Sequence, residues 1–171
     1  RGIGRYTLSL TEAIVKNRGQ HEVILALNGL FPETIEGIRA AFQDLLPQEN
    51  IRVWEAPGPV SDNTPDNTER RLVAELEREA FLASLQPDVI HVHSLFEGFG
   101  DDAVVSIGRY DRKTPVSVTL HDLIPLIYPQ QYLEPNEVFA SYYNNKIKHL
   151  KRASLFLSIS ESSSREVVEH L

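Results

Sequence analysis

The sequence predicts an α/β protein with a Rossmann-like, doubly wound parallel sheet. Strand-like and helix-like hydrophobic patterns alternate along the whole chain. The strand-like runs are nearly continuous in apolar residues, which is typical of parallel strands covered on both faces. Helical segments separate most of these runs, and right-handed crossovers arrange such units into a doubly wound fold.

The first half of the chain begins with a glycine-rich loop, RGIG, that opens a helix over 5–17. Tyr6, Leu10 and Ile14 lie on one face of that helix, and Gly19 ends it. Proline-rich residues 56–67 have no periodicity and are interpreted as a mobile loop. The other expected elements are a strand at 22–27, a helix at 32–46, a strand at 51–54 and a helix at 68–85.

The second half continues the alternation of strands and helices. Pro87 and Asp88 precede a short apolar run, and Pro115 precedes a β-branched one. The expected elements are strands at 89–92, 116–120 and 155–159, a weaker helix at 101–110, and helices at 135–152 and 161–171.

Composition restricts the class of protein. The chain has 171 residues, 42% hydrophobic and 24% charged, as expected for one globular domain. A net charge of −7 without a long basic stretch argues against binding to nucleic acid phosphates. Cysteine is absent, which excludes a disulfide scaffold and a thiolate metal site but leaves the cellular compartment open. No apolar run is long enough to span a membrane and no signal peptide is present, so we expect a cytoplasmic protein.

Two features indicate that the chain is a piece of a longer protein. It contains no methionine, and it opens on a glycine loop that no strand precedes. In doubly wound folds a strand normally leads into that loop. We therefore expect the first strand of the sheet to lie upstream of Arg1.

The main candidate site is the His121-Asp122 pair, which directly follows the strand expected at 116–120. Open parallel sheets bind ligands outside the carboxyl ends of their strands, so His121 is the first candidate for a catalytic group. The alternative is a histidine that only bonds backbone at a strand end. Asp122 either orients the imidazole or starts the following turn, a position where aspartate is common.

Gly2, Gly4 and Arg5 form the second candidate site. Free N–H groups at a helix start bind anions, and Arg5 in the first turn opposes the helix dipole unless an anion neutralises it. The alternative is an ordinary flexible lead into a helix, because a lone G-x-G is a weak signal.

His91 and His93 alternate along one strand and therefore point to the same face. A zinc site there needs a third ligand, which the sequence does not supply. His93, with Ser94 and Glu97 just beyond it, lies at the carboxyl end of the strand, whereas His91 is expected to be packed.

One basic cluster occupies the end of the helix at 135–152. Phe139, Tyr143, Ile147 and Leu150 form a core stripe on this helix, and cations near its end complement the dipole. The alternative function for these cations is contact with a membrane surface.

Five segments in this order resemble the amino-terminal domain of the retaining group 1 (family 4) glycosyltransferases, which have a GT-B architecture of two Rossmann-like domains. The segments are GIGRY, HEVILAL, PDVIHVHS, VTLHDLIPLIYP and LFLSISESSSREVV. The HDLIPLIYP form resembles members that add mannose or related sugars to lipid-linked glycans or O-antigens.

The resemblance implies that residues 1–171 are the acceptor-side domain of an enzyme that moves a sugar from a nucleotide-sugar to a glycan or lipid-linked acceptor, with retention and without a metal or cofactor. The donor-binding carboxy-terminal domain would be its partner, and residues 1–171 alone would be inactive. A peripheral position at the inner membrane face would suit a lipid-linked acceptor.

For the site, the resemblance implies catalytic roles for His121 and Asp122. It implies contacts to donor phosphate or acceptor for a second set of residues: Gly2, Gly4, Arg5, His93, Ser94 and Glu97. The alternative is a non-catalytic ligand-binding or interaction domain, because fold does not fix function.

Overall fold

The computed structural model describes residues 2–171 and divides into two compact units, the first ending at Ala56 and the second running from Pro57 to Leu171. Every described strand pairs in parallel with its neighbour. The first unit holds a two-stranded sheet, β1-β2, and the second a three-stranded sheet, β3-β4-β5. The α/β class and the parallel pairing are confirmed, but the strands form two sheets where the sequence predicted one.

The first unit is built from two helices and two strands around a small apolar core. Its elements are α1 (Gly2–Lys16), β1 (Leu25–Asn28), α2 (Pro32–Ala41), the 3-10 turn η1 (Gln48–Asn50) and β2 (Ile51–Trp54). Val15, Phe42, Leu46 and Ile51 are buried together. Helix α2 is shorter than predicted because the chain turns at Phe42, which places Phe42 and Leu46 in that core.

The predicted glycine loop at the amino end is wrong. Gly2 and Gly4 lie within the first turn of α1, and a Cβ at either position would meet open space. Neither glycine has the positive φ that a tight turn requires. The first N–H groups of a helix have no carbonyl partners in a preceding turn, so the helix can begin at Gly2 and include both glycines. Arg1 lies outside the described residues.

The second unit carries the larger sheet. Its elements are η2 (Pro65–Asn67), α3 (Thr68–Ser84), β3 (Ile90–Val92), β4 (Val116–Leu120), α4 (Ile124–Ile127), α5 (Pro129–Tyr132), α6 (Glu137–Leu150), β5 (Leu155–Ser158) and α7 (Glu161–His170). All residues of the central strand β4 are buried. Tyr143, Ile147 and Leu150 of α6 pack in the core of the second unit, with Phe139 partly buried beside them. This confirms the apolar stripe predicted for this helix.

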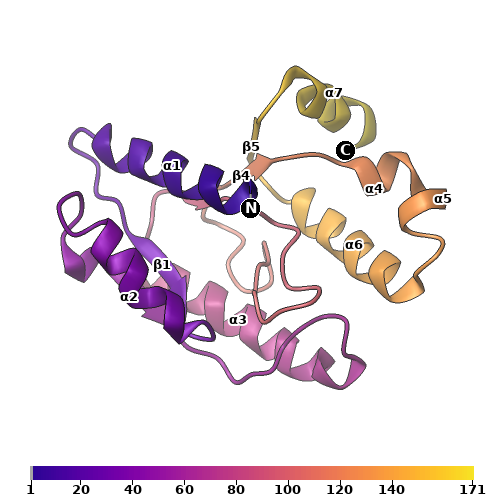
Figure 1. Ribbon diagram of the computed structural model, residues 1–171, viewed down its shortest axis with the longest axis horizontal. Coiled ribbons are helices and arrows are strands. Elements are labelled where there is room, and N and C mark those ends of the chain that lie inside the picture. The colour runs from indigo at the N-terminus through magenta and orange to yellow at the C-terminus, as the bar shows by residue number, and fades with distance from the viewer. Residues whose placement is uncertain (1) are drawn as a thin grey trace. The chain divides into compact units, whose positions relative to one another are not determined.

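The connection between β3 and β4 contains no helix, so the helix predicted at 101–110 is wrong. Figure 1 draws this stretch as a loop without helical turns. Gly98 and Gly108 take φ angles of +91° and +71°, which are left-handed and interrupt a helix. The Asp101 carboxylate also accepts a hydrogen bond from the Ala103 N–H, an interaction that competes with helical bonding.

Charged side chains of α3 supply the partners that a helix would have given this backbone. Glu79, which is 5% exposed, accepts hydrogen bonds from the Ser106 hydroxyl at 2.6 Å and from the Tyr110 N–H at 2.6 Å. Arg78 donates to the Ser106 carbonyl, and Glu75 pairs with Arg109 at 2.7 Å. The inward face of α3 is therefore charged, and its charges are used to hold backbone.

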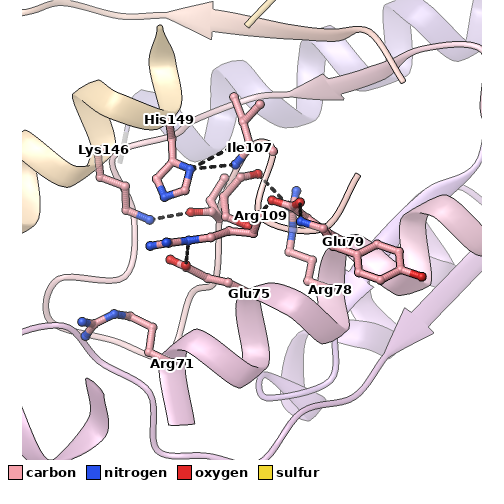
Figure 2. Close-up of polar contacts among 12 residues, drawn as sticks. Arg71, Glu75, Arg78, Glu79, Ile107, Arg109, Lys146 and His149 are labelled. Atoms are coloured by element: carbon pink, nitrogen blue, oxygen red, sulfur yellow. Dashed lines mark hydrogen bonds and ion pairs between the residues drawn. The ribbon is translucent and has the colours of Figure 1, made fainter. Parts of the chain in front are cut away.

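Helix α6 holds the same connection from its other side, as Figure 2 shows. Lys146, 2% exposed, donates to the Val105 carbonyl at 2.6 Å, and burial lowers the pKa of its ammonium to about 8. His149 Nδ1 lies 2.9 Å from the Ile107 carbonyl oxygen. Side chains from two helices thus converge on residues 105–111.

The proline-rich segment 56–67 is tied to the connection and does not hang free as the predicted mobile loop would. The Asp102 carboxylate accepts from the Val60 N–H at 2.6 Å and from the Ser61 N–H at 3.1 Å. The Asp62 N–H donates to the Gly98 carbonyl, and the Val60 side chain is fully buried.

Replacing Glu79 with alanine tests the charged support of this connection. The change removes a buried acceptor from a hydroxyl and two backbone N–H groups and takes from Arg78 the more strongly acting of its two neighbouring carboxylates, leaving Glu75. We expect a loss of about 3 kcal/mol or more in the free energy of unfolding, measured by chemical denaturation. The matched control is Glu77→Ala at an exposed position of the same helix, for which we expect a change within about 0.5 kcal/mol. Equal effects of the two changes would contradict this account.

Candidate functional site

The candidate site lies at the carboxyl edge of the three-stranded sheet. His93 and Ser94 follow β3, His121 and Asp122 follow β4, and Ser160 follows β5. Because the three strands are parallel and paired in register, their carboxyl ends meet at one edge. The structure therefore brings together the site residues that the sequence predicted for these strands.

His121 is oriented by the neighbouring strand. Its ring is partly exposed, and Nε2 lies 3.3 Å from the His93 carbonyl oxygen. A carbonyl only accepts hydrogen bonds, so the contact requires a proton on Nε2. The backbone beyond β3 thus selects the tautomer and the direction of the imidazole, as is common for functional histidines.

His91 and His93 differ in their roles. The His91 ring lies within hydrogen-bond distance of two hydroxyls of β4, Ser117 at 2.8 Å and Thr119 at 3.0 Å. His91 is thus packed into the sheet face, as expected. The two histidine rings meet edge to face at 4.6 Å. Burial, together with the neighbouring His91 and His121, lowers the pKa of His93 to about 4. His93 is therefore neutral at pH 7.

The loop after β3 is rigid at the point where Ser94 and Glu97 meet. The Ser94 hydroxyl donates to the Glu97 carboxylate at 2.7 Å, and the Tyr142 hydroxyl donates to the Glu97 carbonyl at 3.2 Å. The side chain of Leu95 is buried, and Phe96 stacks on Tyr143 with 4.8 Å between ring centroids. A carboxylate and a hydroxyl on so fixed a loop can bind hydroxyls of a ligand.

Asp122 starts a turn. Its carboxylate accepts from the Ile124 N–H at 3.1 Å, two residues ahead, which supports the turn interpretation. Gly2, Gly4 and Arg5 are exposed at the start of α1 in the first unit, where the first N–H groups of the helix have no intrahelical partner.

Two contacts at this edge come from residues that the sequence analysis missed. The Ser163 hydroxyl donates to the His121 carbonyl, and the Glu166 carboxylate accepts from the Leu123 N–H. Both residues lie on α7, more than forty positions from their partners. The polar run ESSSRE indicates a helix start but no particular partner.

The chemistry available at this edge is hydrogen bonding and acid–base exchange by imidazole, hydroxyl and carboxylate groups. Within residues 2–171, no group of three or more His, Cys, Asp or Glu residues is arranged to hold a metal ion. No described helix is long and apolar enough to cross a membrane.

Comparison with known proteins points to one family. The model of Glycosyltransferase Family 4 matches residues 1–171. Serotype-specific mannosyltransferases WbdA of Escherichia coli are similar to the chain, one at 36% identity over 99% of it and another at 34% over 94%. The chain spans 20% of the length of these relatives. No solved structure matches significantly.

Gly98 fixes the loop that carries Ser94 and Glu97, and its replacement tests that role. At its φ of +91°, an added Cβ would overlap the Ala103 carbonyl oxygen. We expect Gly98→Ala to lower the free energy of unfolding by about 2 kcal/mol or more. Gly100→Ala is the matched control, since a Cβ there meets nothing within 4 Å. Denaturation curves of the two variants decide the point, and a Gly98→Ala protein as stable as Gly100→Ala would contradict it.

The buried histidine predicts a pH dependence of stability. His93 has a pKa of about 4 in the folded state, against 6.5 for an unperturbed histidine, so the unfolded chain binds more protons between these values. The resulting stability is present above pH 6.5 and is lost as the pH falls toward 4. We expect the unfolding midpoint of His93→Asn to fall less than that of the wild type between pH 7.5 and pH 4.5. Parallel pH profiles would assign the acid sensitivity to other groups.

Proposed function

Because the chain belongs to Glycosyltransferase Family 4, we propose that it is the acceptor-side domain of a retaining mannosyltransferase. In this proposal the enzyme transfers mannose from a nucleotide-sugar to a glycan or lipid-linked acceptor, without a metal or cofactor. The similarity to WbdA mannosyltransferases supports the choice of sugar. The proposed partner within the same enzyme is a donor-binding carboxy-terminal domain of a GT-B architecture.

The observation that carries the proposal is the position of His121 at the carboxyl edge of the sheet. Its ring is held by the His93 carbonyl on one side, and Ser94 and Glu97 lie on the adjacent loop. As the bond between sugar and diphosphate breaks, negative charge builds on the leaving group and positive charge on the sugar. An imidazole fixed before the reaction stabilises such a changing charge without reorganising, which lowers the barrier.

The remaining site residues receive supporting roles in the proposal. Ser94 and Glu97 bind hydroxyls of the acceptor, and Asp122 shapes the turn that follows His121. Gly2, Gly4 and Arg5 bind the donor diphosphate or a charged acceptor, since a helix start with a nearby guanidinium attracts anions. These residues alone do not transfer sugar, because the donor is held mainly by the second domain.

We also propose a cytoplasmic enzyme with a peripheral contact at the inner membrane face. Lys148 and Lys151 are exposed around the end of α6, where cations face solvent and can meet acidic headgroups, whereas Arg152 beside them donates to the Ile107 carbonyl at 3.0 Å. The net charge of −7 keeps such a contact weak.

Replacing His121 with alanine in the full-length enzyme tests the catalytic assignment. A donor screen with nucleotide-sugars, GDP-mannose among them, first establishes transfer by the wild type. We then expect His121→Ala to lower kcat by about 100-fold or more, comparable to removing one preorganised polar group from a charge-stabilising site. His170→Ala on α7 is the matched control and should keep wild-type kcat.

Two outcomes would contradict the proposal in different ways. A His121→Ala enzyme with near-normal kcat and a lowered unfolding temperature would make His121 a structural strand-end residue. A wild-type protein that binds glycan but transfers no sugar from any donor would favour a non-catalytic binding domain of the same fold.

A further inference from the structure

We propose that Ser163 and Glu166 of α7 are positioning residues, which hold the backbone corner 121–123 and through it the His121 imidazole. The inference rests on the proposed function of His121 and goes beyond it, because it assigns the geometry of that residue to a helix that follows it in the chain by about forty positions. Neither residue touches the substrate in this proposal.

The sheet stops supplying hydrogen-bond partners to the backbone of β4 just before this corner. The ladder between β4 and β5 ends with the Ile159 N–H donating to the Leu120 carbonyl at 3.2 Å. Beyond it β5 gives way to the Ser160 cap and then to α7. The next polar groups of the β4 chain, from His121 onward, need other partners, because a buried carbonyl or N–H without one is costly.

Ser163 supplies the first partner. Its hydroxyl donates to the His121 carbonyl oxygen at 2.6 Å, and the residue is only 3% exposed. Its position is set in turn by the helix cap, since the Ser163 N–H donates to the Ser160 hydroxyl oxygen at 3.1 Å. The His121 carbonyl is therefore bonded by a group that the start of α7 holds in place.

Glu166 supplies the second partner, one turn further along α7. Its carboxylate accepts from the Leu123 N–H at 2.7 Å, a short bond to a charged acceptor. The Leu123 side chain is 0% exposed in the core, so the residue is fixed at both its backbone and its side chain. The two bonds from α7 lie on either side of Asp122 and fix the path of the chain through the corner.

The backbone of this corner determines where the imidazole points. The Cα–Cβ direction of His121 follows from its backbone, and the ring then meets the His93 carbonyl at 3.3 Å. Releasing the corner from α7 would let the Cα shift and lengthen that contact. Displacements of about 1 Å at a reacting group cost up to about 100-fold in rate, so a supporting bond can matter for chemistry as well as for stability.

A purely structural role for these residues makes a different forecast. It predicts a loss of stability with effects on kcat that add to those of His121→Ala. A positioning role predicts non-additivity, because a residue that acts through His121 has nothing left to position once the imidazole is gone.

The experiment combines four variants of the full-length protein: Glu166→Ala, Glu166→Gln, Glu169→Ala and the double variant His121→Ala/Glu166→Ala. Glutamine keeps an oxygen that can accept from Leu123 N–H, and Glu169, whose side chain is 66% exposed on the same helix, is the matched control. The measurements are kcat and KM for transfer, and amide hydrogen exchange of the peptide covering residues 121–127.

We expect Glu166→Ala to lower kcat by about tenfold or more with KM changed less than threefold, and to speed exchange at residues 121–127. Glu166→Gln should recover most of the rate, and Glu169→Ala should match the wild type. In the His121→Ala background, the further loss from Glu166→Ala should stay below about threefold.

Two results overturn the inference. Unchanged exchange at residues 121–127 in Glu166→Ala shows that the carboxylate does not hold the corner, whether or not the protein transfers sugar. Additive losses of kcat in the double variant show that Glu166 does not act through His121. Failure of the proposed function would be seen in a different measurement, as the absence of sugar transfer by the wild type.

Discussion

The backbone between β3 and β4 has neither helix nor strand to satisfy its polar groups, and the arrangement of the sheet edge depends on the charged side chains that satisfy them. Glu79 alone accepts from Ser106, Tyr110 and Asp111, while Lys146 and His149 reach the same segment from α6. Burying these charges costs free energy that an apolar core would not cost. In return, a long irregular crossover is fixed at several points, and its first residue, His93, contacts the His121 ring through its carbonyl oxygen.

This support explains why the site can be both polar and rigid. Asp102 fastens the proline-rich segment to this connection, so two stretches of irregular chain are bonded to one another, and the connection is bonded to α3 and α6. Phe96 and Phe99 add aromatic contacts with α6. Groups that must meet a transition state without reorganising are best placed on such a fixed frame.

Sequence patterns predicted the regular elements well and failed where a polar face is buried. The bounds of β2 and β4 match the predicted strands, because short apolar runs between turn signals have few alternatives. The hydrophobic periodicity of α3 separates two faces of the helix but does not show which face is buried. Leu72 and Val73 are 44% and 43% exposed, whereas Glu75 is 2% exposed. The helix predicted at 101–110 is a loop in the structure. Its apolar residues Val104, Val105 and Ile107 are buried or packed against a core, and its bonding partners lie on α3 and α6, so they cannot be inferred from the local sequence.

The same limit separates what the sequence could say of the site from what it could not. His121 was predictable because a β-branched run that ends in a titratable pair marks a strand end. Its orientation was not, since that depends on the His93 carbonyl and on Ser163 and Glu166, which only the folded chain brings near. A serine and a glutamate three apart on a polar helix would ordinarily be solvent-facing groups. They bond to the corner because β5 ends beside β4 and α7 begins there, so the parallel register of two strands decides which side chains can reach the candidate catalytic histidine.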